Sequence, residues 1–142
     1  MIHGRRTALI VLVCLFVLMT GCSRKYIQEG YEGGATFIDI SPKAATELIQ
    51  LKKALVIVDV RTGREYRGGH IPGAIHLSYF DILFGSTKGL PPGAPLLLVC
   101  ATGHRSYWAG GKLLGKGYSE IYDLSGGMKA WSAAGYPSVT AD

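Results

Sequence analysis

Apolar and polar residues follow one another in blocks that predict a regular succession of strands and helices. The continuous apolar runs at 55–58 and 96–99 are typical of strands buried on both faces of a sheet. After Ser41, which suits a helix cap, apolar residues recur at helical spacing through Lys52. From residue 36 onward the pattern predicts strands at 37–40, 55–58, 73–77, 96–99 and 121–124, and helices at 41–52, 62–67, 79–84, 105–114 and 126–131.

This alternation of elements predicts the class of fold. Strands that alternate with helices, and that are apolar without interruption, indicate an α/β domain with an open, mainly parallel sheet flanked by helices on both faces. The 142 residues suffice for one domain of ordinary size and are too few for two. Ligands bind such sheets beyond the carboxyl ends of the strands, and Cys100 directly follows the run 96–99.

The N-terminal segment predicts export. Two arginines precede an apolar run at 7–19, which is shorter than the roughly 20 residues that a membrane-spanning helix needs. Thr20-Gly21-Cys22 then resembles the lipobox of bacterial lipoproteins, although Met19 stands where leucine is usual. The resemblance implies a signal peptide at 1–21 and a lipid on Cys22. An ordinary signal peptide or an uncleaved anchor is the alternative.

A lipid on Cys22 would decide where the protein works. It would hold the exported chain on a membrane. Ser23, rather than Asp, follows the cysteine, which in lipoproteins implies the outer membrane. We therefore expect the periplasmic side of the outer membrane in a Gram-negative source, and otherwise the outer face of the cytoplasmic membrane. Residues 22–35 are polar and glycine-rich and indicate a tether to the domain at 36–142.

The charge of the chain argues against nucleic acid as a partner. The formal net charge is +5, and loss of the signal peptide would remove two of the 15 basic residues, leaving 13 against 10 acidic ones. These basic residues occur only in short pairs such as Arg24-Lys25, which are typical of a solvated surface. Nothing in the pattern requires an oligomer, and we expect a monomer.

Cys100 is the candidate nucleophile. It stands between a buried strand and the start of a helix, where unpaired N–H groups and the helix dipole stabilise a thiolate. Cys14 would leave with the signal peptide and Cys22 would carry lipid, so Cys100 would be the sole free thiol of the mature chain. A lone thiol is a liability in an oxidising compartment, which favours a use for it. The alternative is a buried, inert cysteine.

Four motifs in order resemble those of the rhodanese-homology domain over residues 36–137. They are Asp59-Val60-Arg61, the string Gly69-His70-Ile71-Pro72-Gly73-Ala74, the loop 100–105, and Gly126-Gly127 followed by Trp131. The resemblance implies a thiosulfate sulfurtransferase. Cys100 would take the outer sulfur of a donor such as thiosulfate as a persulfide and pass it to cyanide or a thiol, with no metal or organic cofactor.

The loop after Cys100 would bind the transferred sulfur. The N–H groups of the residues that follow the cysteine can converge on the sulfur and on the leaving anion, which makes substrate-binding candidates of Ala101, Thr102, Gly103, His104 and Arg105. Two roles are open for Thr102. It either donates a hydrogen bond to the persulfide or only forms part of the turn in the loop. Arg105 either holds an anionic donor or pairs at the helix start. We expect His104 to face solvent and Ser106 to cap the helix.

Residues away from this loop are expected to be mostly structural. Arg61 and Asp59 stand at a strand end, where they brace the loop, or where Arg61 contacts substrate. His70 and His76 lack a metal-ligand set, so we expect no metal site. One of Tyr107 and Trp108 is expected to pack and the other to line the pocket rim, and Trp131 to lie in the core.

Two other functions are weighed against sulfur transfer. Cysteine phosphatases and the related arsenate reductases place five residues between cysteine and arginine, whereas four separate Cys100 from Arg105. The smaller loop favours a sulfur atom over phosphate. The second alternative is a persulfide carrier or a binding module without turnover. Its motivation is the predicted lipid anchor, which would place the chain beside other envelope proteins.

Overall fold

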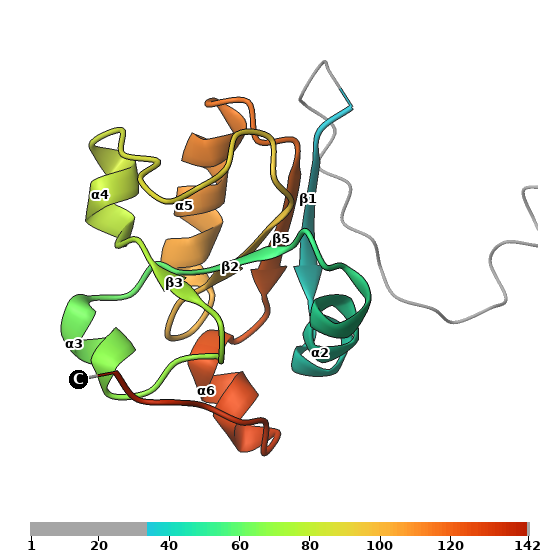
Figure 1. Ribbon diagram of the computed structural model, residues 1–142, viewed down its shortest axis with the longest axis vertical. Coiled ribbons are helices and arrows are strands. Elements are labelled where there is room, and N and C mark those ends of the chain that lie inside the picture. Colours follow the sequence, from blue (N-terminus) through green and yellow to red (C-terminus); the bar gives the residue numbers. More distant parts are fainter. Residues whose placement is uncertain (1–33, 142) are drawn as a thin grey trace, which may run out of the picture.

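All five strands of the sheet run parallel. The computed structural model describes residues 34–141, in which the strand order is β1-β5-β4-β2-β3 (Figure 1). The strands are β1 (Thr36–Ile40), β2 (Val56–Asp59), β3 (Ile75–His76), β4 (Leu96–Val99) and β5 (Glu120–Leu124). This arrangement confirms the open parallel sheet.

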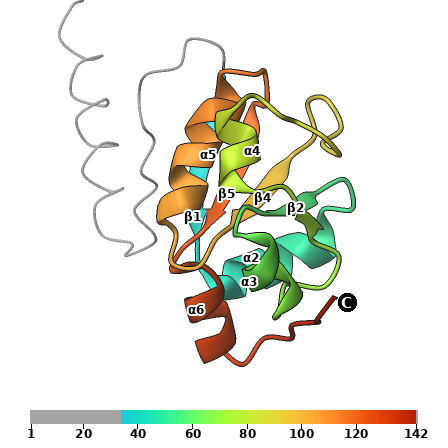
Figure 2. The same ribbon diagram turned by 90° about the vertical axis from the view of Figure 1, so that its left-hand side faces the viewer.

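Helices cover both faces of the sheet, as predicted. They are α2 (Pro42–Leu51), α3 (Gly63–Arg67), α4 (Tyr79–Leu83), α5 (His104–Leu114) and α6 (Gly127–Ala133). Helices α4 and α5 lie together on one face, and α2 and α6 lie against the other (Figures 1 and 2). Each strand alternates between the two cores. In β4, Leu96 and Leu98 point to the α5 side, and Leu97 and Val99 to the other.

One predicted strand is much shorter than expected. The interval 73–77 was expected to be extended throughout, but β3 comprises only Ile75 and His76. The reason is a turn just before it, in which the N–H of Ala74 donates to the carbonyl of Ile71 at 3.0 Å. β4 matches its predicted range, and each of the other elements differs from the prediction by no more than two residues at either end.

The carboxyl ends of β2 and β4 form the crevice that this class of sheet uses for ligands. The two strands are neighbours, and the N–H of Val60 still donates to the carbonyl of Val99 at 2.8 Å beyond the ladder. The chain leaves β4 through α5 toward β5, but leaves β2 toward β3 at the opposite edge. Because the connections diverge here, the ends of β2 and β4 stay open, and Cys100 lies at this point.

Most of the N-terminal segment for which we predict export lies outside the residues that the structure describes. The signal peptide at 1–21, Cys22 and all of the tether 22–35 except its last two residues lie outside the described residues. Within 34–141, no helix has both the length and the apolar character to cross a membrane.

Replacing Leu98 by alanine is expected to destabilise the fold strongly. Leu98 is fully buried beneath α5 in the central strand. We expect Leu98→Ala to lower the free energy of unfolding by about 2–5 kcal/mol, because it leaves a cavity in a packed core. Leu51→Ala is the control, since Leu51 is 84% exposed and should change stability by less than about 0.5 kcal/mol. Urea unfolding measures both, and equal losses would contradict the packing described.

Candidate active site

The Cys100 sulfur is enclosed by hydrogen-bond donors at the N-terminus of α5. The residue is 1% exposed. Its Sγ accepts a hydrogen bond from the N–H of Gly103 at 3.0 Å and one from the Ser106 hydroxyl at 3.3 Å. The α5 helix adds the partial positive charge of its first turn. The predicted position of Cys100, between a buried strand and a helix, is therefore confirmed.

These donors favour the thiolate form. Burial acts to raise the pKa of the Cys100 thiol, because it removes the charged form from water. The hydroxyl and N–H of Ser106 and the N–H groups of Thr102 and Gly103 act against burial, and the pKa lies below the ordinary value of a cysteine. A lowered pKa increases the fraction of thiolate, which is the nucleophilic form of a cysteine.

The loop is held in place from its other side by α6. The N–H of Met128 donates to the carbonyl of Cys100 at 2.8 Å, and the N–H of Lys129 donates to the carbonyl of Ala101 at 3.1 Å. Gly127 makes this approach possible: it has φ +57°, and a Cβ there would collide with the Cys100 carbonyl oxygen and lie 2.6 Å from the Ala101 carbonyl carbon. The loop carbonyls thus face α6, and the N–H groups are left to face the sulfur.

The N-cap position of α5 is occupied by Gly103, and not by Ser106. Gly103 is the N-cap residue with φ +97°, a conformation that favours glycine, and no side chain caps the helix. The expectation that Ser106 caps the helix is therefore wrong. Its hydroxyl lies one turn inside the helix, where it contacts the Cys100 sulfur and the carbonyl of Gly103 at 3.2 Å. The sequence alone did not indicate that Ser106 contacts the sulfur.

Arg105 pairs with a glutamate and is not free. Its Nη1 and Nη2 donate to the two carboxylate oxygens of Glu65 at 3.0 and 2.7 Å. The hydrogen bond from Arg105 is the main reason that the pKa of Glu65 falls to about 2. Of the two roles open for Arg105, the structure shows the pairing at the helix start. Glu65 also completes the capping box of α3 with Thr62, as its spacing predicts.

Arg61 braces the neighbouring strand end. It is 7% exposed, and its Nε and Nη2 donate to the carboxylate of Asp59. Nη2 also donates to the carbonyl of Gly69 at 2.6 Å, which ties β2 to the segment before β3. The sequence suggested that Arg61 and Asp59 brace the Cys100 loop, but the hydrogen bonds of Arg61 brace the segment at Gly69 instead.

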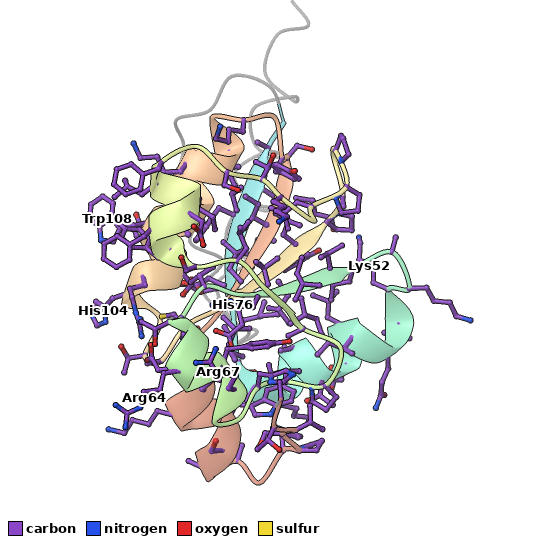
Figure 3. The ribbon with its side chains drawn as sticks, turned by 60° about the vertical axis from the view of Figure 1, so that its left-hand side comes forward. Lys52, Arg64, Arg67, His76, His104 and Trp108 are labelled. Carbon is purple, nitrogen blue, oxygen red and sulfur yellow. The ribbon has the colours of Figure 1, made fainter. Side chains whose placement is uncertain are left out.

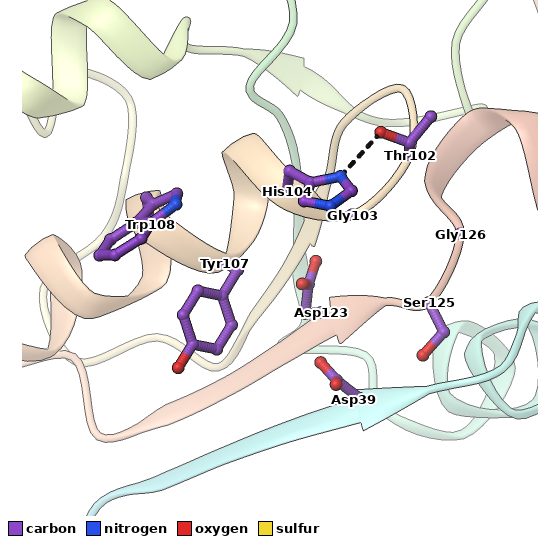
Figure 4. A pocket seen from close by; sticks show the side chains of 9 residues that line it. All are labelled: Asp39, Thr102, Gly103, His104, Tyr107, Trp108, Asp123, Ser125 and Gly126. Atoms are coloured by element: carbon purple, nitrogen blue, oxygen red, sulfur yellow. Dashed lines mark hydrogen bonds between the residues drawn. The ribbon is translucent and has the colours of Figure 1, made fainter.

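The remaining loop side chains lie at the surface. Thr102 and His104 are exposed, and the Thr102 hydroxyl lies 3.2 Å from the His104 Nδ1 (Figure 4). Ala101 is half-buried and contributes its carbonyl to α6. Tyr107 and Trp108 are both exposed, at 41% and 65%. The expectation that one of them packs is met only in part, because the Tyr107 ring meets the Phe37 ring edge to face.

A second buried polar group near the site was not foreseen. Asp123 in β5 is 3% exposed, and burial raises the pKa of its carboxyl to about 7, with the Ser106 hydroxyl acting in the opposite direction. A signal was present in the sequence, since Asp123 interrupts an apolar strand two residues after Ile121. Strand alternation places both residues on the α5 face.

The aromatic and histidine residues away from the loop are structural. His70 and His76 both stack on Tyr66, with ring centroids 3.8 and 5.0 Å apart. Trp131 is 2% exposed in the core beside α6, as expected, and its Nε1 donates to the carbonyl of Pro137.

Known proteins are similar to this chain in sequence and in fold. The model of the rhodanese-like domain family matches residues 41–134. The chain is 37% identical to the thiosulfate sulfurtransferase GlpE of Pseudomonas putida over 105 residues, which cover 74% of this chain and 93% of that protein.

Solved structures agree with this match. A rhodanese-related protein from Thermoplasma volcanium superposes with a TM-score of 0.64 at 31% identity, over 72% of this chain and 98% of that one. A protein of unknown function and possible tyrosine phosphatase from Rhodopseudomonas palustris gives 0.60 at 28% identity, over 68% and 80%. The fold is therefore shared with proteins to which different chemistries are attributed.

Removing the Ser106 hydroxyl is expected to slow the reaction of Cys100. Ser106→Ala deletes a hydrogen bond to the thiolate and so raises the pKa of Cys100. We expect alkylation by iodoacetamide at pH 7 to slow by about tenfold, and its pH profile to move to higher pH. Ser119→Ala, an exposed serine before β5, is the control. An unchanged pH profile in Ser106→Ala would contradict the role assigned to the hydroxyl.

The Glu65–Arg105 pair is expected to contribute stability that disappears in acid. The pKa of Glu65 is lowered from 4.5 to about 2 on folding, so its contribution is present above pH 4.5 and is lost as the pH falls toward 2. Both side chains are 33% exposed, and solvent screening limits the loss in Glu65→Gln at pH 7 to about 0.5–1 kcal/mol.

The pH dependence of unfolding distinguishes this pair from a general charge effect. The difference between Glu65→Gln and the parent should shrink toward zero near pH 2. Glu47→Gln is the matched control, because Glu47 is exposed on α2 and forms no ion pair within residues 34–141. A difference that stays constant from pH 7 to pH 2 would exclude the ion pair as its source.

Proposed function

Because the chain belongs to the family of rhodanese-like domains, we propose that it is a thiosulfate sulfurtransferase that carries sulfur on Cys100. The observation on which this rests is the Cys100 sulfur, buried among N–H and hydroxyl donors at the end of β4. The similarity to the thiosulfate sulfurtransferase GlpE over 93% of that protein's length supports the same activity.

The first step transfers sulfur from the donor. The Cys100 thiolate attacks the outer sulfur of thiosulfate, so that a new S–S bond forms at Sγ while the S–S bond of the donor breaks. Sulfite leaves with the electron pair of that bond, and a persulfide remains on Cys100. The donors around Sγ stabilise the negative charge on the sulfur before and after transfer.

A groove with basic side chains beside the loop suits an anionic donor. The groove measures about 420 Å³, and its lining includes Arg61, Arg64 and Glu65. Arg61 and Glu65 have ionic partners, but Arg64 is exposed and forms no ion pair among the described residues. Arg64 lies on the same side of the molecule as His104 of the loop (Figure 3). Arg64 therefore replaces Arg105 as the candidate that attracts the donor.

The second step needs an acceptor from outside the chain. Cys100 is the free cysteine of the described residues, and Cys14 and Cys22 belong to the predicted signal peptide and lipid site. No internal thiol is then available to resolve the persulfide. A cyanide ion or an external thiol takes the outer sulfur, and the Cys100 thiolate is regenerated.

The N-terminal sequence supports a place at a membrane surface. We propose that the chain is exported, cleaved after residue 21 and anchored by lipid on Cys22, with 22–35 as the tether. The reaction would then take place at the periplasmic face of the outer membrane in a Gram-negative source, or outside the cytoplasmic membrane otherwise.

Intact mass with and without thiosulfate tests the activity. We expect the protein to gain one sulfur atom, Cys100→Ser to gain none, and Ser119→Ala to behave as the parent. Thiocyanate formation from cyanide should fall by at least about 10³-fold in Cys100→Ser, because the nucleophile is lost. The same mass, measured on protein from membranes, reports the lipid on Cys22.

Two outcomes would contradict the proposal. Full thiocyanate formation by Cys100→Ser would show that Cys100 is not the nucleophile. A stable gain of sulfur in the parent without turnover would indicate a persulfide carrier rather than an enzyme.

A further inference from the structure

A second groove, of opposite character, lies on another side of the Cys100 loop. It measures about 360 Å³. We call it the acidic groove, and its lining includes Asp39, Gly103, His104, Tyr107, Trp108 and Asp123 (Figure 4).

Two carboxyl groups in the acidic groove form no ion pair with any residue of 34–141. Asp39 of β1 and Asp123 of β5 are register neighbours in the parallel ladder. Asp39 is exposed, whereas Asp123 is 3% exposed and its Oδ1 has no hydrogen-bond partner within residues 34–141. Neither residue forms an ion pair in that part of the chain. A buried carboxyl oxygen without a donor is costly, so the groove favours a ligand that supplies one.

The other wall of the acidic groove is aromatic. The rings of Tyr107 and Trp108 are 41% and 65% exposed and meet edge to face, with centroids 5.7 Å apart. Aromatic faces attract organic cations, whereas a bare metal ion needs several oxygen ligands. Carboxylates opposite aromatic rings therefore fit a protonated amine on a small organic molecule.

We propose that the acidic groove binds the ammonium group of the acceptor, which is a small thiol that carries an amine. Gly103 connects the groove with the reaction, because it lines the groove and its N–H donates to the Cys100 sulfur. A bound aminothiol would have its cation at Asp39 and Asp123 and its sulfur toward the loop. The inference rests on the proposed sulfur transfer, and it assigns donor and acceptor to two grooves of opposite charge.

The transfer itself balances without another reactant. The thiolate of the aminothiol attacks the outer sulfur of the Cys100 persulfide and forms an S–S bond with it. The bond between that sulfur and Sγ breaks, and its electron pair returns to Cys100 as the thiolate. The product is the persulfide of the aminothiol.

The charge of the acidic groove depends on pH. Burial raises the pKa of the Asp123 carboxyl to about 7, the Ser106 hydroxyl opposes this, and the charge of Asp39 adds to it. His104 and Tyr107 on α5 are the other titratable side chains that line the groove. Because the Asp123 carboxyl is mostly ionised above its pKa, the experiments below are set at pH 8.

Binding of propylammonium, which has no thiol, tests the site separately from the reaction. In NMR titrations of the full chain we expect saturable shifts of the Trp108 indole N–H and the Gly103 amide, and none with 1-propanol. Asp39→Asn, a change of an exposed side chain, should weaken binding by about fivefold. Glu47→Gln removes a carboxylate on α2 and should bind as the parent does. Absence of saturable shifts in the parent would overturn the proposal.

Transfer rates test the acceptor role. Persulfidated protein is mixed with cysteamine or with 2-mercaptoethanol at equal thiolate concentration, and the ratio of the two rate constants is measured. We expect cysteamine to be favoured, and Asp39→Asn, but not Glu47→Gln, to lower the ratio by about fivefold. An unchanged ratio in Asp39→Asn would overturn the acceptor role. If no persulfide forms, the proposed function fails and the acceptor role with it, whereas propylammonium binding still reports on the groove.

Discussion

The active site depends on two backbone hydrogen bonds from the start of α6 to the carbonyls of Cys100 and Ala101. They turn these carbonyls away from the sulfur, and the N–H groups that follow are therefore directed toward it. Gly127 permits the contact because any Cβ at that position would collide with the loop backbone. The donors around the sulfur thus come from the main chain and from the Ser106 hydroxyl, and such fixed donors need little reorganisation during the proposed sulfur transfer.

Charge is distributed around this cradle in an ordered way. Arg61 and Arg105, both close to the loop, are neutralised by Asp59 and Glu65 and serve to hold elements together. Each of the two grooves holds charged groups that form no ion pair in the described chain, which are Arg64 in one and Asp39 and Asp123 in the other. Paired charges beside the Cys100 sulfur, with a basic groove and an acidic groove near it, are consistent with the proposed reaction, in which the two substrates differ in charge.

Most of the fold followed from the sequence because its elements are encoded locally. The apolar run before Cys100 became the central strand β4, and the helix predicted at 62–67 formed as α3, with a capping box at its start. The prediction was wrong for the length of β3, where a turn at Ile71–Ala74 takes residues that were expected to be extended. Local propensity does not show whether a hydrogen-bonded turn or a longer strand is more stable at these residues.

The sequence by itself determined the candidate nucleophile, the order of strands and helices along the chain, and the number of residues in the loop, because each is set by neighbours along the chain. Only the tertiary structure decided what surrounds the sulfur and what each charged group does. Arg105 meets Glu65 across 40 positions of sequence, and Asp39 lies beside Asp123 through the pairing of β1 with β5. Ser106 was expected to cap α5, but Gly103 occupies the cap position, and the Ser106 hydroxyl donates a hydrogen bond to the Cys100 sulfur instead. These partners are brought together by the winding of the sheet, which no local pattern specifies.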